Sequence, residues 1–518
     1  MRRLLLLVTP AILACGGGDG GSAPARNTII DSRDTYDPRS MDPALSTDVP
    51  TGRAVAYMFD GLTRFTPDAQ VVPGLAKSWD ASPDGLTYTF HLRNGVRFHD
   101  GRPFSARNVV ASFQRVLDPA TRGGRGWPLY PMRGAEDYAA GKAKTIAGLS
   151  APNDSTVVIT LKEPLAIFPK LLAMPVASIV PENPGSDFGQ KPIGTGPWKF
   201  VEWRHDDYIK FAKNPEYFDG PPKSDSLMAR IIPERSTATA EFEAGNVDVL
   251  NVNEQETRTW EQDPDKQKLL QSAAALRFWY VAINVTRGPL RDLRVRQALN
   301  HAVNVPTMLQ QVLGGRGRAA AGVIPPSLSG ADTTRQGHAY DVAKAKQLLA
   351  QAGFPNGIDL ELWTANTDAS PRIAQTIQAN LAEAGVRVKL VSRDAASMRE
   401  ASRKGQTDLA LKEWWADYPD AENFLYPLLH SRNKGVGGNV SFWGNPQFDR
   451  LVDEAHREQN EARRNQLYTQ ADQIAFNEAP MLFLFFYKDL YAVQPWIKGF
   501  TVPTVFSGQR WTDVTIQK

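Results

Sequence analysis

Cysteine is almost absent from this 518-residue chain, because Cys15 is the only one. A single thiol excludes a disulfide within the chain and a metal cluster built from thiolates. Histidine is also sparse, and no two of the seven lie four residues apart; they stand at positions 91, 99, 205, 301, 338, 430 and 456. Since no H-E-x-x-H pattern occurs either, a metal site built on histidine is not expected, although distant carboxylates could still form one.

The motifs of familiar enzymes are missing as well. The sequence contains no G-x-S-x-G elbow, no Walker loop and no cysteine nucleophile in its body. "GTGPWK" at 194–199 has two glycines of a phosphate-binding loop but neither the third glycine nor a following helix, so it predicts a turn before a strand. A carboxylate pair such as Asp417 and Asp420 suits glycoside hydrolysis, yet such pairs far more often cap loops. We therefore predict a protein that is not an enzyme and needs no cofactor, with a secreted hydrolase as the alternative from a different class.

Neither sign of charge dominates the chain. Lysine and arginine total 59 against 56 aspartate and glutamate, for a net charge of +3. This balance offers no basic field for a nucleic acid. The length suffices for two to four domains with sizeable cores, and 12 tryptophans supply many flat aromatic surfaces.

The N-terminal stretch "MRRLLLLVTPAILACGGGDGGSAPAR" has the pattern of a secretory leader. A basic start is followed by an apolar run that is too short to span a membrane stably. "ILAC" at 12–15 resembles the lipobox of bacterial lipoproteins, in which cleavage precedes a cysteine that then receives a lipid. We predict a signal peptide at 1–14, lipidation of Cys15 and a flexible tether at 15–26. The predicted location is the bacterial cell envelope, outside the cytoplasm and anchored to a membrane by lipid.

The rest of the chain mixes strands and helices. Alternation of apolar and polar residues predicts strands at 87–93 and 155–162, and Ser105 is the expected N-cap of a helix at 105–119. Further along, the pattern predicts helices that begin at Asp341 and Ser370, a strand at 386–391, a long helical stretch at 447–477 and a buried strand at 481–493. Alternating helices and strands indicate an α/β protein.

Residues 411–425, "LKEWWADYPDAENFL", place a carboxylate beside two tryptophans. If the chain is extended here, Trp415 and Asp417 share one face. A carboxylate held against aromatic rings loses solvation and needs a cationic partner, either from the protein or from a ligand.

Ordered motifs along the chain resemble those of the bacterial extracellular solute-binding proteins of family 5, the peptide- and nickel-binding group. The resemblance rests on "PGLAKSWDASPDGLTYTFHLRNGVRFHDGRPFSARNVVASFQRVLDP" at 73–119, followed by "PIGTGPWKFVEW", "NPEYFDGPP", "AGNVDVL", "LRVRQALNHAV" and "WWADYPDAENFL". It implies a two-lobed periplasmic-binding-protein-like fold (type II, cluster C-like) with an extra α+β domain inserted in the first lobe. The expected boundaries are 27–45, 185–270 and 490–518 for the first lobe, 46–184 for the inserted domain and 271–489 for the second lobe.

The resemblance also implies a function and a set of ligand contacts. A monomer would capture a short peptide between its lobes and deliver it to the permease subunits of an ABC transporter. Asp417 would receive the α-ammonium group of the peptide, Arg372 its carboxylate, and Trp415 would cover a side chain or peptide plane, while Tyr280 would line the cleft. Asp417 could instead pair with a neighbouring arginine, and Tyr280 could be core. An oligosaccharide or a nickel chelate remains an alternative ligand, because the fold alone does not decide it.

Overall fold

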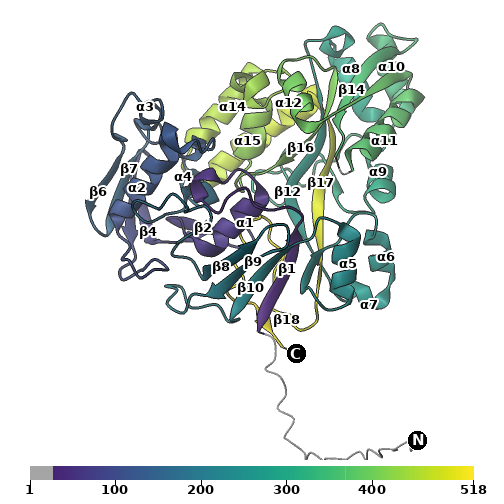
Figure 1. Cartoon of the computed structure of the whole chain (residues 1–518). Helices are drawn as coiled ribbons and strands as arrows, with labels where there is room; N and C mark the ends of the chain where they lie inside the picture. Colours follow the sequence, from purple (N-terminus) through teal and green to yellow (C-terminus); the bar gives the residue numbers. More distant parts are fainter. Residues whose placement is uncertain (1–26, 368, 518) are drawn as a thin grey trace, which may run out of the picture.

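The computed structural model describes residues 27–367 and 369–517 (Figure 1). The predicted leader and Cys15 therefore lie outside the described residues. Among the helices that are described, none is long and apolar enough to cross a membrane.

A mixed sheet of 11 strands runs through the molecule. Its order is β15 (Val386–Arg393), β14 (Ile358–Ala365), β16 (Leu409–Trp415), β12 (Leu270–Ile283), β17 (Met481–Val493), β11 (Val249–Asn251), β1 (Thr28–Asp34), β10 (Ser226–Ile231), β9 (Tyr208–Lys213) and β8 (Trp198–Arg204), and β13 (Arg318–Ala319) also pairs with β17.

The long strands β12 and β17 join the two halves of this sheet (Figure 1). Each pairs with the other over most of its length, while β12 also pairs with β16 on one side and β17 with β11 on the other. The predicted strand at 481–493 is confirmed. Its nearly continuous apolar sequence suits a strand with both faces covered.

Helices cover both faces of each half of the sheet. Their bounds are α1 (Val49–Met58), α2 (Ala106–Leu117), α3 (Ala135–Ala139), α4 (Phe168–Leu171), α5 (Arg235–Glu243), α6 (Thr257–Gln262), α7 (Pro264–Gln267), α8 (Leu293–His301), α9 (Val305–Val312), α10 (Val342–Gln351), α11 (Ser370–Glu383), α12 (Ala395–Arg403), α13 (Glu422–Leu429), α14 (Pro446–Arg457) and α15 (Glu461–Glu478). On the half of the sheet that holds β14, β15 and β16, apolar side chains of α8 to α11 pack on one face, and those of α13 to α15 pack on the other.

Two predicted details of the helices are wrong. The predicted helical stretch at 447–477 is two helices, because the chain leaves helical geometry at Glu458 and starts again after the N-cap Asn460. Ser370 is the first residue of α11 rather than its N-cap, which is Ala369 and has no capping side chain. The predicted N-cap Asp341 is confirmed, since its carboxylate accepts a hydrogen bond from the Lys344 N–H.

A separate sheet forms within residues 46–184. It has the order β4 (Ala76–Ala81), β5 (Thr87–Leu92), β7 (Thr156–Thr160) and β6 (Leu149–Asn153), and β2 (Thr63–Phe65) pairs with β3 (Val71–Pro73) beside it. The strands predicted at 87–93 and 155–162 are confirmed, as is the helix that follows Ser105. One apolar core joins this region to α13, α14 and α15. The predicted boundaries of the lobes and of the inserted domain stay predictions.

Candidate functional site

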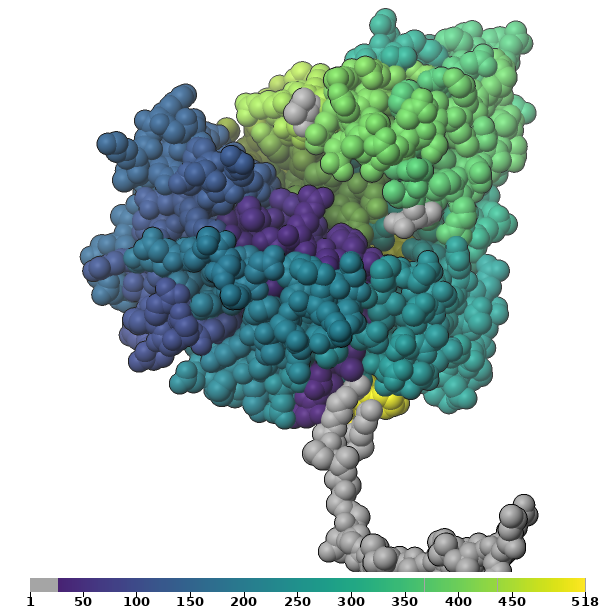
Figure 2. Space-filling model, viewed as in Figure 1, coloured from purple at the N-terminus to yellow at the C-terminus, as the bar shows by residue number. Residues whose placement is uncertain are grey.

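A cavity of about 590 Å³ lies where the two halves of the molecule meet. Its wall combines residues from β1, β11, β12, β16, β17, α5, α11 and the segment 503–506. Figure 2 shows a hollow between the teal lower part and the green upper part of the molecule. A space of this size is typical for a small ligand.

Aromatic side chains around Arg277 form one wall of the cavity. The guanidinium carbon of Arg277 lies 4.4 Å from the ring centre of Trp415, 4.3 Å from that of Tyr487 and 5.8 Å from that of Trp279. Its charge is also paired with the carboxylate of Glu413. Burial lowers the pKa of Arg277, and negative neighbours oppose this shift only in part. The aromatic wall is thus held in place by a paired cation.

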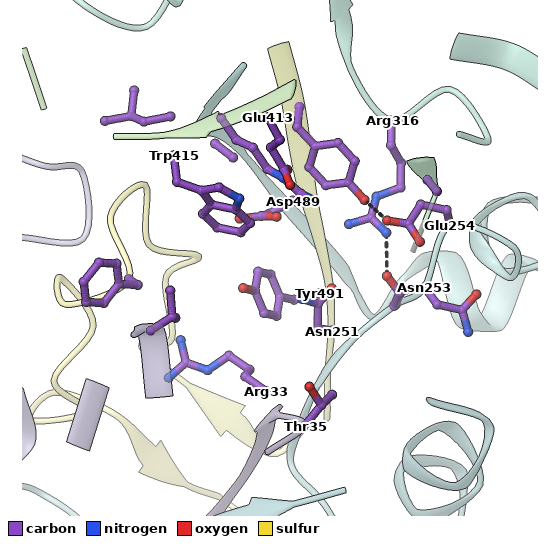
Figure 3. A pocket seen from close by; sticks show the side chains of 18 of the residues that line it. Arg33, Thr35, Asn251, Asn253, Glu254, Arg316, Glu413, Trp415, Asp489 and Tyr491 are labelled. Atoms are coloured by element: carbon purple, nitrogen blue, oxygen red, sulfur yellow. Dashed lines mark hydrogen bonds and ion pairs between the residues drawn. The ribbon is translucent and has the colours of Figure 1, made fainter. Parts of the chain in front are cut away.

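Two further arginines line the cavity from the lower half. Arg33 donates to both oxygens of Asp31, with Nη2 to Oδ2 at 2.8 Å, and Arg53 pairs with Asp34 at 2.5 Å. Figure 3 shows Arg33 and Thr35 below the open space, with Tyr491 above them. Because each of these arginines has its own carboxylate, their charges are largely neutralised within the protein.

Arg316 and Glu254 form a polar corner. Arg316 donates to the backbone oxygens of Val252 at 2.5 Å and Lys488 at 3.2 Å, and Glu254 accepts a hydrogen bond from the hydroxyl of Tyr487 (Figure 3). Burial alone would raise the pKa of Glu254, but the Tyr487 hydrogen bond and the positive charge of Arg316 outweigh it and lower that pKa. Glu254 is therefore an anion at neutral pH.

Asp489 is a carboxylate in the cavity wall that forms no hydrogen bond with any described residue. It lies on β17 between the exposed Lys488 and the buried Leu490 and is half-buried. Burial raises its pKa, and the positive charges of Arg277 and Arg316 offset this effect only in part. Figure 3 shows Asp489 beside Trp415 and above Tyr491, at the edge of the open space. A ligand cation placed there would supply the partner that the carboxylate lacks.

Of the predicted ligand contacts, Trp415 and Arg372 line the cavity. Trp415 is the last residue of β16, and 45% of its surface is exposed. Arg372 lies in the first turn of α11, and its side chain forms no hydrogen bond or ion pair with the described residues.

Asp417 does not belong to the cavity wall. Strand β16 ends at Trp415, so the alternation of faces does not continue to Asp417. Its side chain pairs with Arg125 at 2.5 Å, and its backbone N–H donates to Asn423. Burial raises the pKa of Asp417, and the Arg125 charge opposes the shift. The carboxylate already has the arginine partner that the sequence left open, and its predicted role in binding an ammonium group stays a prediction.

Tyr280 is buried, with 3% of its surface exposed, and does not line the cavity. It stacks on Phe278 in the core that faces α13 to α15. The neighbouring residue Trp279 points to the opposite face of β12 and contributes to the cavity instead. The residue of this strand that lines the cavity is therefore Trp279, one position before the expected Tyr280. In a strand, a shift by one position moves a side chain to the opposite face.

Sequence reasoning missed Asp489, Arg277 and Arg235 as cavity residues. A signal for Asp489 was present, because a carboxylate inside the apolar run "MLFLFFYKDLYAV" is unusual for a buried strand. No local signal marks Arg277 or Arg235, since isolated arginines are usually solvated.

Comparison with known proteins agrees with this architecture. The profile described as "Bacterial extracellular solute-binding proteins, family 5 Middle" matches residues 70–436. The chain belongs to this family. Like the family's other members, it is a solute-binding protein with a two-lobed fold of the periplasmic binding proteins.

Two relatives and one structure illustrate the range of ligands named for this family. The chain is 33% identical to heme-binding protein A of Haemophilus influenzae, over 83% of this chain and 81% of the relative. It is 34% identical to di/tripeptide-binding protein 1 of Pseudomonas aeruginosa, over 86% of each chain. The periplasmic binding protein DppA of Helicobacter pylori, solved with the peptide STSA, superposes with a TM-score of 0.78 at 30% identity, covering 95% of this chain and 98% of that one.

Proposed function

We propose that this family 5 protein captures short peptides in the cavity between its halves and passes them to an ABC importer. The observation that carries the proposal is the unpaired carboxylate of Asp489 in a cavity that also contains guanidinium groups without protein partners among the described residues. A peptide with free ends has a cation at one end and an anion at the other. The named ligands of two of the proteins compared above, a di- or tripeptide and STSA, support this choice.

Each open group of the cavity has a proposed role. Asp489 binds the α-ammonium group, because an ammonium ion would stabilise the charged form that burial disfavours. Arg372 binds a carboxylate with two parallel hydrogen bonds, and Trp415 packs on the peptide plane or on a side chain. Asp489 is the carboxylate that the geometry favours over Asp417 for the ammonium group, because Asp417 is paired with Arg125.

The remaining parts of the proposal concern the cell. Secretion through a leader at 1–14 and attachment by a lipid on Cys15 would hold the protein on the outer side of the cytoplasmic membrane, near its permease partners. Under this proposal the protein is not an enzyme, because capturing and releasing a peptide require no covalent bond to be made or broken.

The first experiment is thermal unfolding of the purified protein with di- to pentapeptides, their N-acetylated forms, oligosaccharides and a nickel–histidine chelate. A ligand at about 100 times its Kd adds roughly 2.7 kcal/mol to the free energy of unfolding. We expect free peptides to raise Tm and N-acetylated peptides not to. A rise with sugars or the nickel chelate alone would contradict the peptide proposal.

The same experiment with Asp489→Asn tests the site. This variant should lose at least tenfold in affinity for free peptides, because the ammonium group loses its counter-charge. Asp265→Asn is a matched control, since Asp265 is exposed on α7 and outside the cavity wall. Unchanged peptide affinity in Asp489→Asn would refute the assigned role.

A further inference from the structure

The charges that line the cavity are not balanced. Its wall contains six arginines and four carboxylates, and these are Arg33, Arg53, Arg235, Arg277, Arg316 and Arg372 against Asp34, Glu254, Glu413 and Asp489. A binding site with one ammonium and one carboxylate contact would need no such excess of guanidinium groups.

Four of the arginines already have partners within the protein. Arg33 pairs with Asp31 behind the wall, Arg53 with Asp34, and Arg277 with Glu413. Arg316 donates to the backbone oxygens of Val252 and Lys488, and its charge acts on both Glu254 and Asp489.

Two arginines and one carboxylate remain open. Arg235 and Arg372 form no hydrogen bond or ion pair through their side chains with the residues that the structure describes, and both are only half-buried. Asp489 is the open carboxylate, because it forms no hydrogen bond or ion pair with the described residues, although the charges of Arg277 and Arg316 act on it. The ligand that complements these three groups has two anionic groups and one cationic group.

The two open arginines come from opposite halves of the molecule. Helix α5 lies in the lower half of Figure 1 and α11 in the upper half. Arg235 begins α5, Arg372 lies in the first turn of α11, and both line the same cavity. Two carboxylates at different positions of a ligand can each pair with one of these guanidinium groups.

We infer that the preferred ligand is an acidic short peptide, with two carboxylates and one ammonium group and a net charge of −1. This inference rests on the proposed function and narrows its substrate class. One open arginine binds the terminal carboxylate that every free peptide has, and the other binds a second carboxylate that only acidic peptides have. The second guanidinium is then a specificity determinant, because a neutral peptide leaves it without a partner.

Calorimetric titration with three pairs of tripeptides tests the inference. Each pair has glutamate or glutamine at position one, two or three of an otherwise alanine peptide, so length and shape are matched and only the charge differs. We expect at least one glutamate peptide to bind tenfold or more tightly than its glutamine partner, and this ratio to fall at high salt.

Variants of the two arginines assign the roles. In one of Arg235→Gln and Arg372→Gln, the ratio between glutamate and glutamine peptides should fall to about one while the glutamine peptide binds as before. In the other variant, the affinities for both peptides should fall by the same factor, because the terminal carboxylate that both peptides have loses its partner. Arg399→Gln is the matched control, since Arg399 is exposed on α12 and outside the cavity wall, and it should change neither value.

The possible results distinguish a failure of the acidic-ligand inference from a failure of peptide capture itself. If all glutamate and glutamine peptides bind measurably but equally, peptide capture stands and the inference of an acidic ligand is refuted. If both arginine variants retain the ratio, the assignment of the second carboxylate to them is refuted. If none of the peptides binds, the proposed function fails together with the inference.

Discussion

Asp417 and Asp489 are both half-buried carboxylates, but they differ in what surrounds them. Asp417 lies beyond the end of β16, where the chain turns, and pairs with Arg125 from residues 46–184. Asp489 lies within β17, in a strand that is otherwise mostly apolar, and lines the cavity. Sequence alone indicated a carboxylate beside tryptophan. The structure places Trp415 in the cavity wall and Asp417 outside it.

Replacing Asp417 with asparagine should leave peptide binding almost unchanged. Burial raises the folded-state pKa of Asp417 although the Arg125 charge opposes the shift, so the folded state disfavours the ionised carboxylate and loss of its charge should not lower the free energy of unfolding at pH 7. We expect an equal or higher Tm without ligand and a peptide Kd within twofold of that of the natural chain. Loss of peptide binding at unchanged Tm would show that Asp417 holds the ammonium group after all.

The pH dependence of binding should follow Asp489. Its folded-state pKa is raised by burial, against the opposing charges of Arg277, Arg316 and Arg53, so the carboxylate takes up a proton at a higher pH than an exposed aspartate does. Protonation removes the charge that binds the ammonium group. Peptide affinity should therefore fall as pH is lowered from 7 through that raised pKa, which titration calorimetry at several pH values can measure.

The same shift predicts an effect on stability. Because the raised pKa means that the folded state disfavours the charged form, Asp489 destabilises the unliganded protein above that pKa and ceases to do so as pH falls through it. Asp489→Asn should therefore have an equal or higher Tm than the natural chain at pH 7 without ligand. A lower Tm would indicate that the carboxylate has a structural role.

At the scale of elements, the turn at 194–199 requires glycine because its backbone packs closely against the backbone at the end of α1. The N–H of Gly196 donates to the oxygen of Met58 at 2.8 Å, and a Cβ at Gly196 would lie 2.4 Å from the Met58 carbonyl carbon. The turn leads into β8 as predicted, and its glycines serve the contact with the end of α1. This role explains the two glycines without a phosphate ligand.

Gly196→Ala should accordingly destabilise the protein, by about 1 to 3 kcal/mol, because the added methyl group forces two backbone segments apart. Chemical denaturation measures the loss. Gly185→Ala is the control, since a Cβ there would meet only the side chain of Asp187 at 3.1 Å. Equal stability of the two variants would contradict the packing role of Gly196.

At the scale of the whole molecule, the cavity exists only because distant segments meet. Its walls come from both halves, which β12 and β17 connect (Figure 1). A peptide that bridges Asp489, Arg235 and Arg372 would hold the halves together. Small-angle X-ray scattering should therefore show a smaller radius of gyration at saturating peptide than without peptide.

The Asp489→Asn variant provides the control for that measurement. At a peptide concentration that saturates the natural chain, the variant should keep the radius of gyration of the unliganded protein. Its radius of gyration should decrease only at higher peptide concentrations. An unchanged radius in the natural chain despite calorimetric binding would show that capture does not require the halves to approach.

The family, the α/β class, the strand at 481–493 and four of the helices in the second half (α10, α11, α14 and α15) were determined by the sequence alone. These features depend on local signals, such as apolar periodicity, the helix cap at Asp341 and ordered motifs, which lie within short stretches of chain.

Tertiary structure decided which charges line the cavity. Arg235, Arg372 and Asp489 are separated by more than a hundred residues each, and the two arginines look like ordinary surface charges in the sequence. They meet because the sheet brings their strands and helices to one cavity, and burial there makes an unpaired charge costly unless a ligand supplies its partner.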